Sequence, residues 1–381
     1  MSRWGASMPF DDVVDEMARH YQVTVSEATV RRATYETGEA AEALVQEDVT
    51  RREKGTVTAP VCENNMIVSA DGTLIGLVNG EWREVKSVVV GEFSAMWDEA
   101  SNETQVTTEN MSYFSRSYRV REFERQALAE LHQRGVTEAK TVVAVNDGAE
   151  WIQSFIDYHC PQAVRIIDFS HTMGYIADAG KAVWGEGTPQ FEQWYERMAH
   201  QLKHRPPAQT VAELRLLQPK AKTDEQRANL DRAIFYIQTR LSMMDYPHFR
   251  TKGYPIGSGS VESSHKFVVH KRLKQAGMRW AEHHVDPMLA LRNLLCNDRW
   301  DGSWSEIVAY RQRNHKRHRS RRQRSEESAA PDKPITFADV EVAPEDASHT
   351  PTTTSKADHP WRRGLWPTRE SWRWSRPHLQ K

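Results

Sequence analysis

The sequence predicts a mixed α/β protein whose sheet is interrupted by an all-helical segment. Three observations support this fold class. Three strand-like patterns follow one another between residues 65 and 116, strands and helices then alternate up to residue 171, and residues 172–252 carry only helical patterns. Consecutive strands followed by alternation indicate an antiparallel half joined to a parallel half in one mixed sheet.

Residues 1–58 are expected to be helical. Apolar residues at helical spacing predict a first helix over 9–21. Ser26 is a candidate N-cap for a second helix, which we expect to end at Gly38, and a third helix follows it.

The first two of these helices resemble a helix-turn-helix. In that arrangement the second helix would turn Arg31 and Arg32 outward, toward DNA. A plain helical hairpin that packs on the next domain fits the same pattern, so both interpretations stay open.

The first part of the sheet domain is expected over residues 59–171. Strand patterns occur in the stretches NMIVSADGT, EWREVKSVVVGEF, NMSYFSR, TVVAVNDGAE and AVRIIDFSH. Helical patterns occur in YRVREFERQALAELHQRG and WIQSFIDYH. The resulting order, β-β-β-α-β-α-β, matches that of a ribonuclease-H-like core.

The chain then leaves this core and returns to it. Residues 172–252 are predicted to form an all-α insertion, broken at the Pro-Pro pair 206–207. Residues 253–310 are predicted to complete the core with a helix capped by Ser260 and with final helices. Residues 311–381 are predicted to be a basic and mostly disordered tail.

Overall charge and cysteine usage exclude several classes of protein. The formal net charge is −1, so global charge predicts no partner, but residues 311–324 contain eight Lys or Arg and no acid. The three cysteines are far apart and form no CxxC pair, which argues against a zinc finger and fits a reducing cytosol. No apolar run is long enough for a membrane span, so we expect a cytoplasmic, nucleoid-associated protein.

Two carboxylates stand at expected strand ends, and a third stands on a later helix. Asp71 and Asp147 are each followed by Gly, and Glu262 lies in the first turn after a Gly-Ser hinge. A single Asp-Gly is more often a turn, but two of them in this strand order, with the Glu, predict a converging site. Carboxylate oxygens are the ligands that Mg²⁺ prefers, and Mn²⁺ is expected to substitute. Two such ions support in-line phosphoryl transfer.

A smaller motif, Asp168-x-x-His171, follows the next strand. It is suited either to orienting water or DNA, or simply to capping a helix. Two interpretations of His265 also stay open: it lies near the metals, or it faces solvent or caps a helix.

The motifs VVAVNDGAEWI, RIIDFSH and IGSGSVESSHKFVVHKRLKQAGMRW resemble bacterial insertion-sequence transposases of the Kra type, in the Mutator-like group of Asp-Asp-Glu enzymes. The resemblance covers roughly residues 60–300. It implies that Asp71, Asp147 and Glu262 are the catalytic metal ligands, and that Asp168 and His171 form the family's auxiliary motif. It also implies a ribonuclease-H-like fold with a helical insertion before the Glu.

Cationic and aromatic residues follow the Glu. We expect DNA contacts from Lys266, Lys271, Arg272, Lys274, Arg279 and Trp280. A solvated charged helix face is the alternative.

The function expected from the sequence is therefore a DNA transposase, acting on transposon ends and target DNA as a homodimer or higher oligomer. One alternative is a ribonuclease-H-like nuclease or resolvase, which cuts without joining. The other is an inactive transposase remnant that only binds DNA. Inverted repeats flanking the gene would favour the mobile element.

Overall fold

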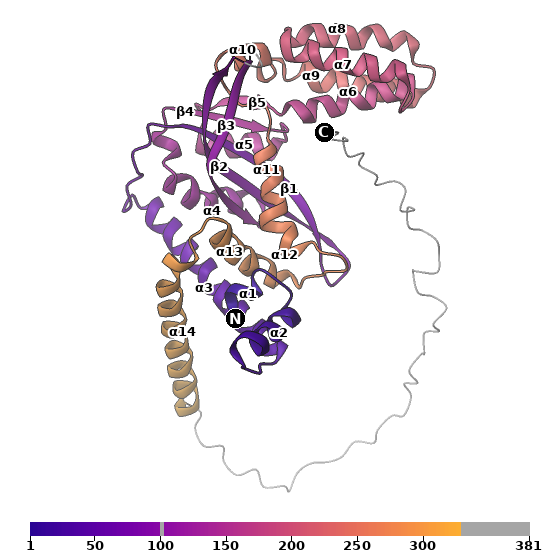
Figure 1. Cartoon of the computed structure of the whole chain (residues 1–381). Coiled ribbons are helices and arrows are strands. Elements are labelled where there is room, and N and C mark those ends of the chain that lie inside the picture. The colour runs from indigo at the N-terminus through magenta and orange to yellow at the C-terminus, as the bar shows by residue number, and fades with distance from the viewer. Residues whose placement is uncertain (100–102, 329–381) are drawn as a thin grey trace, which may run out of the picture. The chain divides into compact units, whose positions relative to one another are not determined.

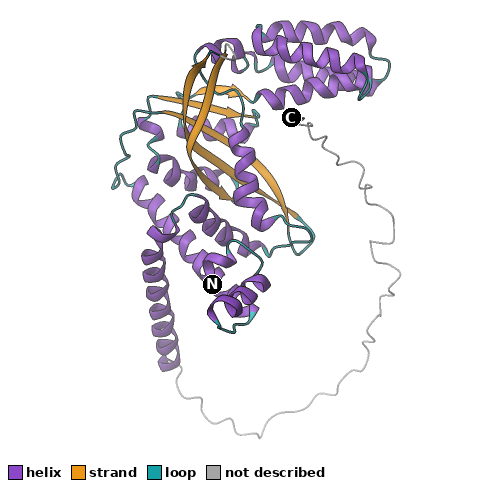
Figure 2. Ribbon diagram, in the orientation of Figure 1, coloured by secondary structure: helices purple, strands orange, loops and turns teal. Residues whose placement is uncertain are grey.

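A computed structural model describes residues 1–99 and 103–328, and residues 1–322 form one compact unit (Figure 1). The predicted mixed sheet is confirmed: its strand order is β3-β2-β1-β4-β5. The pairs β1–β2 and β2–β3 are antiparallel, whereas β1–β4 and β4–β5 are parallel (Figure 2). The strands are β1 Asn65–Gly76, β2 Trp82–Asp98, β3 Glu103–Arg116, β4 Thr141–Asn146 and β5 Val164–Ile167.

One face of the sheet is covered by α4 (Val120–Gln133) and α5 (Glu150–His159). Side chains alternate along a strand, so every second residue of β1 and β4 points to this face. The strand residues Met66 and Val68 pack there against Phe123 of α4, within a buried core. A 3₁₀ turn, Val136–Glu138, leads from α4 to β4.

The opposite face contacts the helical segment between β5 and α11. Ile67, Val143 and Ile166 of the sheet share a second core with these helices. The helices are α6 Phe169–Trp184, α7 Pro189–His204, α8 Pro207–Leu217, α9 Asp224–Gln238 and α10 Tyr246–Thr251, with 3₁₀ turns at Gln218–Lys220 and Leu241–Met243. The predicted break at residues 206–207 is confirmed, because Pro207 begins α8 at a position where the missing N–H does no harm.

The N-terminal helices are α1 (Ser2–Gly5), α2 (Phe10–Tyr21) and α3 (Glu27–Glu53). Ser26 caps α3 as predicted, because its side chain accepts from the N–H of Thr29. The predicted end at Gly38 is wrong. The helix continues through this glycine, which instead allows α3 to approach α13 (Val285–Cys296): a Cβ on Gly38 would lie 2.5 Å from the carbonyl oxygen of Pro287.

The predicted end of the first strand at Asp71 is also wrong. Pairing with β2 continues past Asp71, which lies opposite Ser87, as far as Gly76 opposite Trp82. The chain turns only at Asn79-Gly80, where Gly80 has a φ of +87°. The N–H of Leu77 donates to the carbonyl oxygen of Glu81 over 2.8 Å, so the hairpin closes through a three-residue loop with glycine at its left-handed position.

Beyond the helical segment the chain forms α11 (Gly259–Ser264), a π-helical stretch (His265–His270) and α12 (Lys271–Leu273). Ser260 is not the cap that was predicted, because Ser258 holds the N-cap position and makes no side-chain cap bond. A 3₁₀ turn, Glu282–His284, precedes α13.

The last element is α14 (Trp300–Ser328), so the predicted disordered tail does not begin at residue 311. The rest of that tail, 329–381, lies outside the described residues. Among the helices that the structure describes, none combines the length and apolar character that crossing a membrane requires.

Candidate active site

Asp71 and Asp147 lie just beyond the paired parts of two neighbouring parallel strands. The pairing of β1 with β4 runs from Asn65–Thr141 to Val68–Ala144, so paired residues are 76 positions apart (141 − 65). The same offset separates the two aspartates (147 − 71), and Asp147 directly follows β4. By alternation along β1, Asp71 shares its face with Ile67. The neighbouring strands therefore bring the two carboxylates together.

Glu262 is contributed by a third element of the fold. It lies on α11, which crosses the face of the sheet opposite α4 and α5 (Figure 1). Val261 and Ser264 of α11 are buried, whereas Glu262 is exposed, so the helix packs through its other side chains and leaves this carboxylate in solvent.

The electrostatics of Asp71 show that the three carboxylates interact. Although 39% of its side-chain surface is exposed, the pKa of Asp71 is raised to about 6, chiefly by burial among protein atoms. The N–H of Gly72, which donates to Oδ1 over 2.7 Å, opposes this rise, and the negative charges of Asp147, Glu262 and Glu84 contribute to it. The ionised form of Asp71 is therefore disfavoured both by burial and by its acidic neighbours.

Glu84 also raises the pKa of Asp71, and the sequence interpretation missed this residue. It lies on β2 opposite Leu74, and a Cβ on Gly72 would come within 2.5 Å of its Oε1. Glu84 therefore shares one face of the sheet with Gly72, whereas Asp71 points to the opposite face. The buried Lys86 pairs with Glu84 over 2.6 Å, which balances part of its charge. The register of β1 with β2 sets this proximity across the sheet, and no local motif signals it.

His265 lies against Asp71 from the π-helical stretch. Its Nδ1 is 3.6 Å from Oδ2 of Asp71, and the ring is buried. Burial lowers the pKa of His265 to about 4, so the ring is neutral near pH 7 and the contact is no ion pair. One turn further, His270 Nε2 lies 3.1 Å from the Thr73 hydroxyl, and Lys274 donates to the same oxygen over 3.4 Å. The segment after Glu262 therefore lies along β1.

The loop that carries Asp147 is fixed by hydrogen bonds from two directions. Within the loop, Asp147 Oδ1 accepts from the N–H of Ala149 over 2.9 Å. From α9, the Tyr236 hydroxyl donates to the carbonyl oxygen of Asp147 over 2.6 Å, and the Arg240 guanidinium lies over the Tyr236 ring. The Tyr175 ring stacks on Tyr236 at 4.0 Å. Tyr236 is a second contributor that the sequence did not signal, since it lies in another element.

Asp168 is a structural residue that connects two segments. It is buried, and its Oδ1 accepts from the N–H of His171 as the N-cap of α6. Its Oδ2 accepts from the N–H of Ser258 over 2.5 Å, just before α11. Of the two interpretations left open for this motif, the structure supports the capping one for Asp168. The His171 ring is exposed and packs beside Tyr175 and Tyr236.

The residues predicted to contact DNA divide into two groups. Two of them are buried: Arg272 donates to the carbonyl oxygen of Gly5, and its guanidinium lies 4.9 Å from the centre of the Trp280 ring. The predicted DNA contact of Arg272 and Trp280 is therefore wrong, because both belong to the core beneath α2. The exposed ones are Lys266, Lys271, Lys274, Arg279, Arg31 and Arg32.

Three of the exposed residues have protein partners of their own, and one of them is Lys274, which donates to Thr73. Arg279 lies over the Trp82 ring at 5.4 Å, on the β1–β2 hairpin. Arg31 pairs with Glu27 one turn earlier on α3. Lys266 and Lys271 stand on the segment that follows Glu262, where a nucleic-acid backbone at the carboxylates would reach them.

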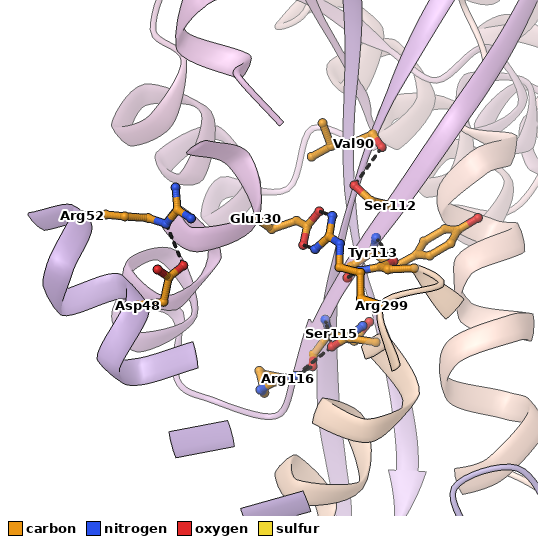
Figure 3. Close-up of polar contacts among 11 residues, drawn as sticks. Asp48, Arg52, Val90, Ser112, Tyr113, Ser115, Arg116, Glu130 and Arg299 are labelled. Carbon is orange, nitrogen blue, oxygen red and sulfur yellow. Dashed lines mark hydrogen bonds and ion pairs between the residues drawn. The ribbon is translucent and has the colours of Figure 1, made fainter. Parts of the chain in front are cut away.

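A separate polar cluster lies between α3, α4 and the start of α14 (Figure 3). Arg299 donates to both oxygens of Glu130, at 2.6 and 2.8 Å, and Glu130 is buried. Nearby, Arg52 pairs with Asp48 over 2.7 Å. These carboxylates are neutralised by arginines, in contrast to the carboxylates around Asp71.

No three His, Cys, Asp or Glu side chains within residues 1–99 and 103–328 are arranged to hold a metal ion. Metal binding at Asp71, Asp147 and Glu262 therefore stays a proposal. No family model matches the chain, and no curated protein matches it either.

Proposed function

We propose that the chain is a DNA transposase of the Asp-Asp-Glu class, which cleaves and joins DNA by metal-dependent phosphoryl transfer. One observation carries the proposal: Asp71 and Asp147 come from adjacent parallel strands, and the charges of Asp147 and Glu262 both act on Asp71. Like charges held together in this way are typical of sites that bind cations.

The sheet topology supports the proposal. The order β3-β2-β1-β4-β5, with three antiparallel strands followed by two parallel ones, is the order expected of a ribonuclease-H-like core. The helical segment between β5 and α11 corresponds to the expected insertion before the catalytic Glu. A fold is compatible with many functions, so the carboxylates and not the topology carry the argument.

Asp71, Asp147 and Glu262 would hold Mg²⁺, with Mn²⁺ able to replace it. Their chemistry fits, because all three are hard oxygen donors and a cation would stabilise the ionised carboxylate of Asp71, which burial and the neighbouring negative charges disfavour. Bound divalent cations supply activation of an attacking water or 3′-hydroxyl and stabilisation of the leaving oxygen.

The remaining residues of the site would position these groups and the DNA. Asp168 fixes the chain just before α11, and Tyr236 fixes the loop of Asp147. The exposed Lys266, Lys271 and Lys274 would neutralise backbone phosphates beside Glu262. Acting on two transposon ends would require a homodimer or a larger assembly.

The test uses labelled DNA that carries both ends of the sequence flanking the gene, including any inverted repeats there, with Mg²⁺ or Mn²⁺. We expect cleavage and joining by the wild type. Glu262→Gln and Asp147→Asn keep the side-chain shape and lose the charge, so they should bind this DNA without cutting it. Glu213→Gln, on α8 and away from the carboxylates, is the matched control and should retain activity.

Three results would discriminate among the functions. Cleavage that survives both Glu262→Gln and Asp147→Asn would overturn the assignment. Cleavage without joining would favour a nuclease or resolvase. Binding without cleavage by the wild type would favour a remnant that only binds DNA.

A further inference from the structure

An open groove of about 610 Å³ lies between β3 and the segment that leads into α11. One wall is formed by β3, including Thr104 and Thr108, and the other by residues 254–263. The volume is in the range of sites that hold a single small ligand or a short stretch of chain.

The groove ends beside the proposed catalytic carboxylate. Ser260 and Ser263 line it, and both stand on α11 within two residues of Glu262. Glu262 itself is not in the lining, so it stands on another side of the same helix. A nucleic-acid strand that crosses α11 from the carboxylate site would therefore enter the groove.

The chemistry of the walls suits a phosphodiester strand. Lys203 of α7 and Arg250 of α10 contribute two cations, and the threonine hydroxyls of β3 contribute hydrogen-bonding groups. Tyr254 adds an aromatic ring, itself packed edge-on against Phe93 with centroids 6.1 Å apart. Cations along a groove together with an aromatic side chain are the usual combination for single-stranded nucleic acid.

In this structure the carboxylate of Glu103 pairs with both cations of the groove, Lys203 and Arg250. Its carboxylate lies 3.4 Å from Lys203 Nζ and 3.0 Å from Arg250 Nη2. These cations lower the pKa of Glu103, so it is ionised at neutral pH. A phosphate at this place would compete with Glu103, which gives the site a distinctive response: removing the Glu103 charge should strengthen binding.

We infer that this groove binds a single DNA strand adjoining the scissile phosphate, with Lys203 and Arg250 as phosphate contacts and Tyr254 as a stacking surface. The inference rests on the proposed function, because it takes Glu262 to be beside the reacting phosphate. It goes beyond that function in assigning a path for one strand between β3 and the helical segment. The strand passes over the helix that carries Glu262.

The test measures binding of a fluorescein-labelled 20-nucleotide single strand to the full chain, by anisotropy in EDTA at several salt concentrations. Lys203→Ala and Arg250→Ala should each weaken binding, and each should reduce the slope of log K against log salt by about 0.7, the value for one single-strand phosphate contact. Arg197→Ala, an exposed arginine earlier on α7, is the matched control and should leave this slope unchanged.

Glu103→Gln provides a readout that a merely structural role would not give. It should tighten single-strand binding by roughly threefold, the scale of one exposed charge contact. Glu196→Gln, which removes an exposed charge from α7, should not. If Glu103→Gln weakens binding, or if Lys203→Ala and Arg250→Ala match the control, the inference is overturned.

The same data separate this inference from the proposed function. Single-strand binding is measured without metal. If the wild type does not cleave DNA in a parallel Mg²⁺ assay, the proposed transposase activity is contradicted, but the inference about the groove is not. Normal cleavage with an unaltered single-strand affinity in all groove variants would contradict the groove alone. An effect on duplex binding with none on the single strand would also contradict it.

Discussion

Asp71 shows how a residue with no local peculiarity acquires an unusual environment. Its carboxylate accepts one backbone N–H, and the charges of Asp147, Glu262 and Glu84 act on it. Glu130 pairs with Arg299, whereas the ring of His265, which lies against Asp71, is neutral. A buried negative charge without such a partner disfavours the folded state, and a bound cation would remove that cost.

This leads to a prediction for the metal-free protein. The pKa of Asp71 is about 6 in the folded state, above its ordinary value of 3.8, so the folded state binds more protons between these values. The contribution of Asp71 to stability is therefore complete below pH 3.8 and is lost as the pH rises through 6. In urea denaturation with EDTA at pH 8, Asp71→Asn should raise the free energy of unfolding by about 1 kcal/mol, a modest value because solvent screens a carboxylate that is 39% exposed.

The control and the pH profile make this prediction specific. Asp178→Asn, at an exposed position on α6, should change stability little at either pH. The advantage of Asp71→Asn should disappear at pH 4. A variant that is less stable than the wild type at pH 8 would contradict the electrostatic account of Asp71.

At the scale of elements, close packing between helices explains a feature that the sequence suggests wrongly. A glycine at this point of the sequence is typical of a helix end, yet α3 continues through Gly38 and packs on α13. The close contact with α13, and not the conformation of α3, requires a glycine here. A Cβ would lie 2.5 Å from the Pro287 oxygen and 2.8 Å from its carbonyl carbon.

Two glycine substitutions should therefore have opposite effects. Gly38→Ala should lower the free energy of unfolding by about 1–3 kcal/mol, because overpacking outweighs the helix propensity of alanine. Gly174→Ala, on α6, should raise it by about 0.5–1 kcal/mol, since a Cβ there meets no atom within 4 Å. Chemical denaturation of both variants would measure this. Stabilisation by Gly38→Ala would mean that α3 and α13 are not packed as described.

The sequence predicts elements better than it predicts their partners. Hydrophobic periodicity located the strands and the helical segment, whereas the Asp-Gly pairs at expected strand ends and the resemblance to transposases brought Asp71, Asp147, Glu262 and Asp168 forward as candidates. It placed the end of β1 too early, because Asp-Gly is a turn pair only where no partner strand continues beyond it. Glu84 influences Asp71, and Tyr236 holds the loop of Asp147, through strand register and helix packing, which no local pattern encodes.

Burial of cations was equally invisible in the sequence. Arg272 and Lys274 stand two residues apart in the same basic run, yet the first is buried and the second is exposed. The difference comes from α1, whose Gly5 carbonyl accepts from Arg272, and from the aromatic ring of Trp280. A charge pattern gives the spacing of cations along a helix, but the packing of distant segments decides which of them meet solvent.

On the scale of the whole molecule, Glu130 and Arg299 join parts of the chain that are 169 positions apart (Figure 3). Glu130→Ala would leave the guanidinium of Arg299 partly buried without its partner, so we expect the free energy of unfolding to fall by about 3 kcal/mol. Arg19→Ala, which removes an exposed pair with Glu16, should cost less than about 1 kcal/mol.

A double-mutant cycle would separate the pair from the packing of its side chains. Glu130→Ala combined with Arg299→Ala should be less destabilised than the sum of the single variants, because no unpaired charge is left. Strictly additive effects would contradict a direct interaction between these two residues.

The clasp at Asp168 has a consequence for variation in length. The helical excursion begins and ends at one carboxylate, since Asp168 accepts from both His171 and Ser258, and the N–H of Phe169 donates to the carbonyl oxygen of Ile256. Because hydrogen bonds join the two ends of this helical segment, residues added to or removed from its distal turns need not change the position of Glu262. The number of positions between Asp147 and Glu262 is therefore free to drift or to be engineered. A foreign module inserted at the turn after α8 would extend the excursion outward and leave the spacing of the carboxylates in place.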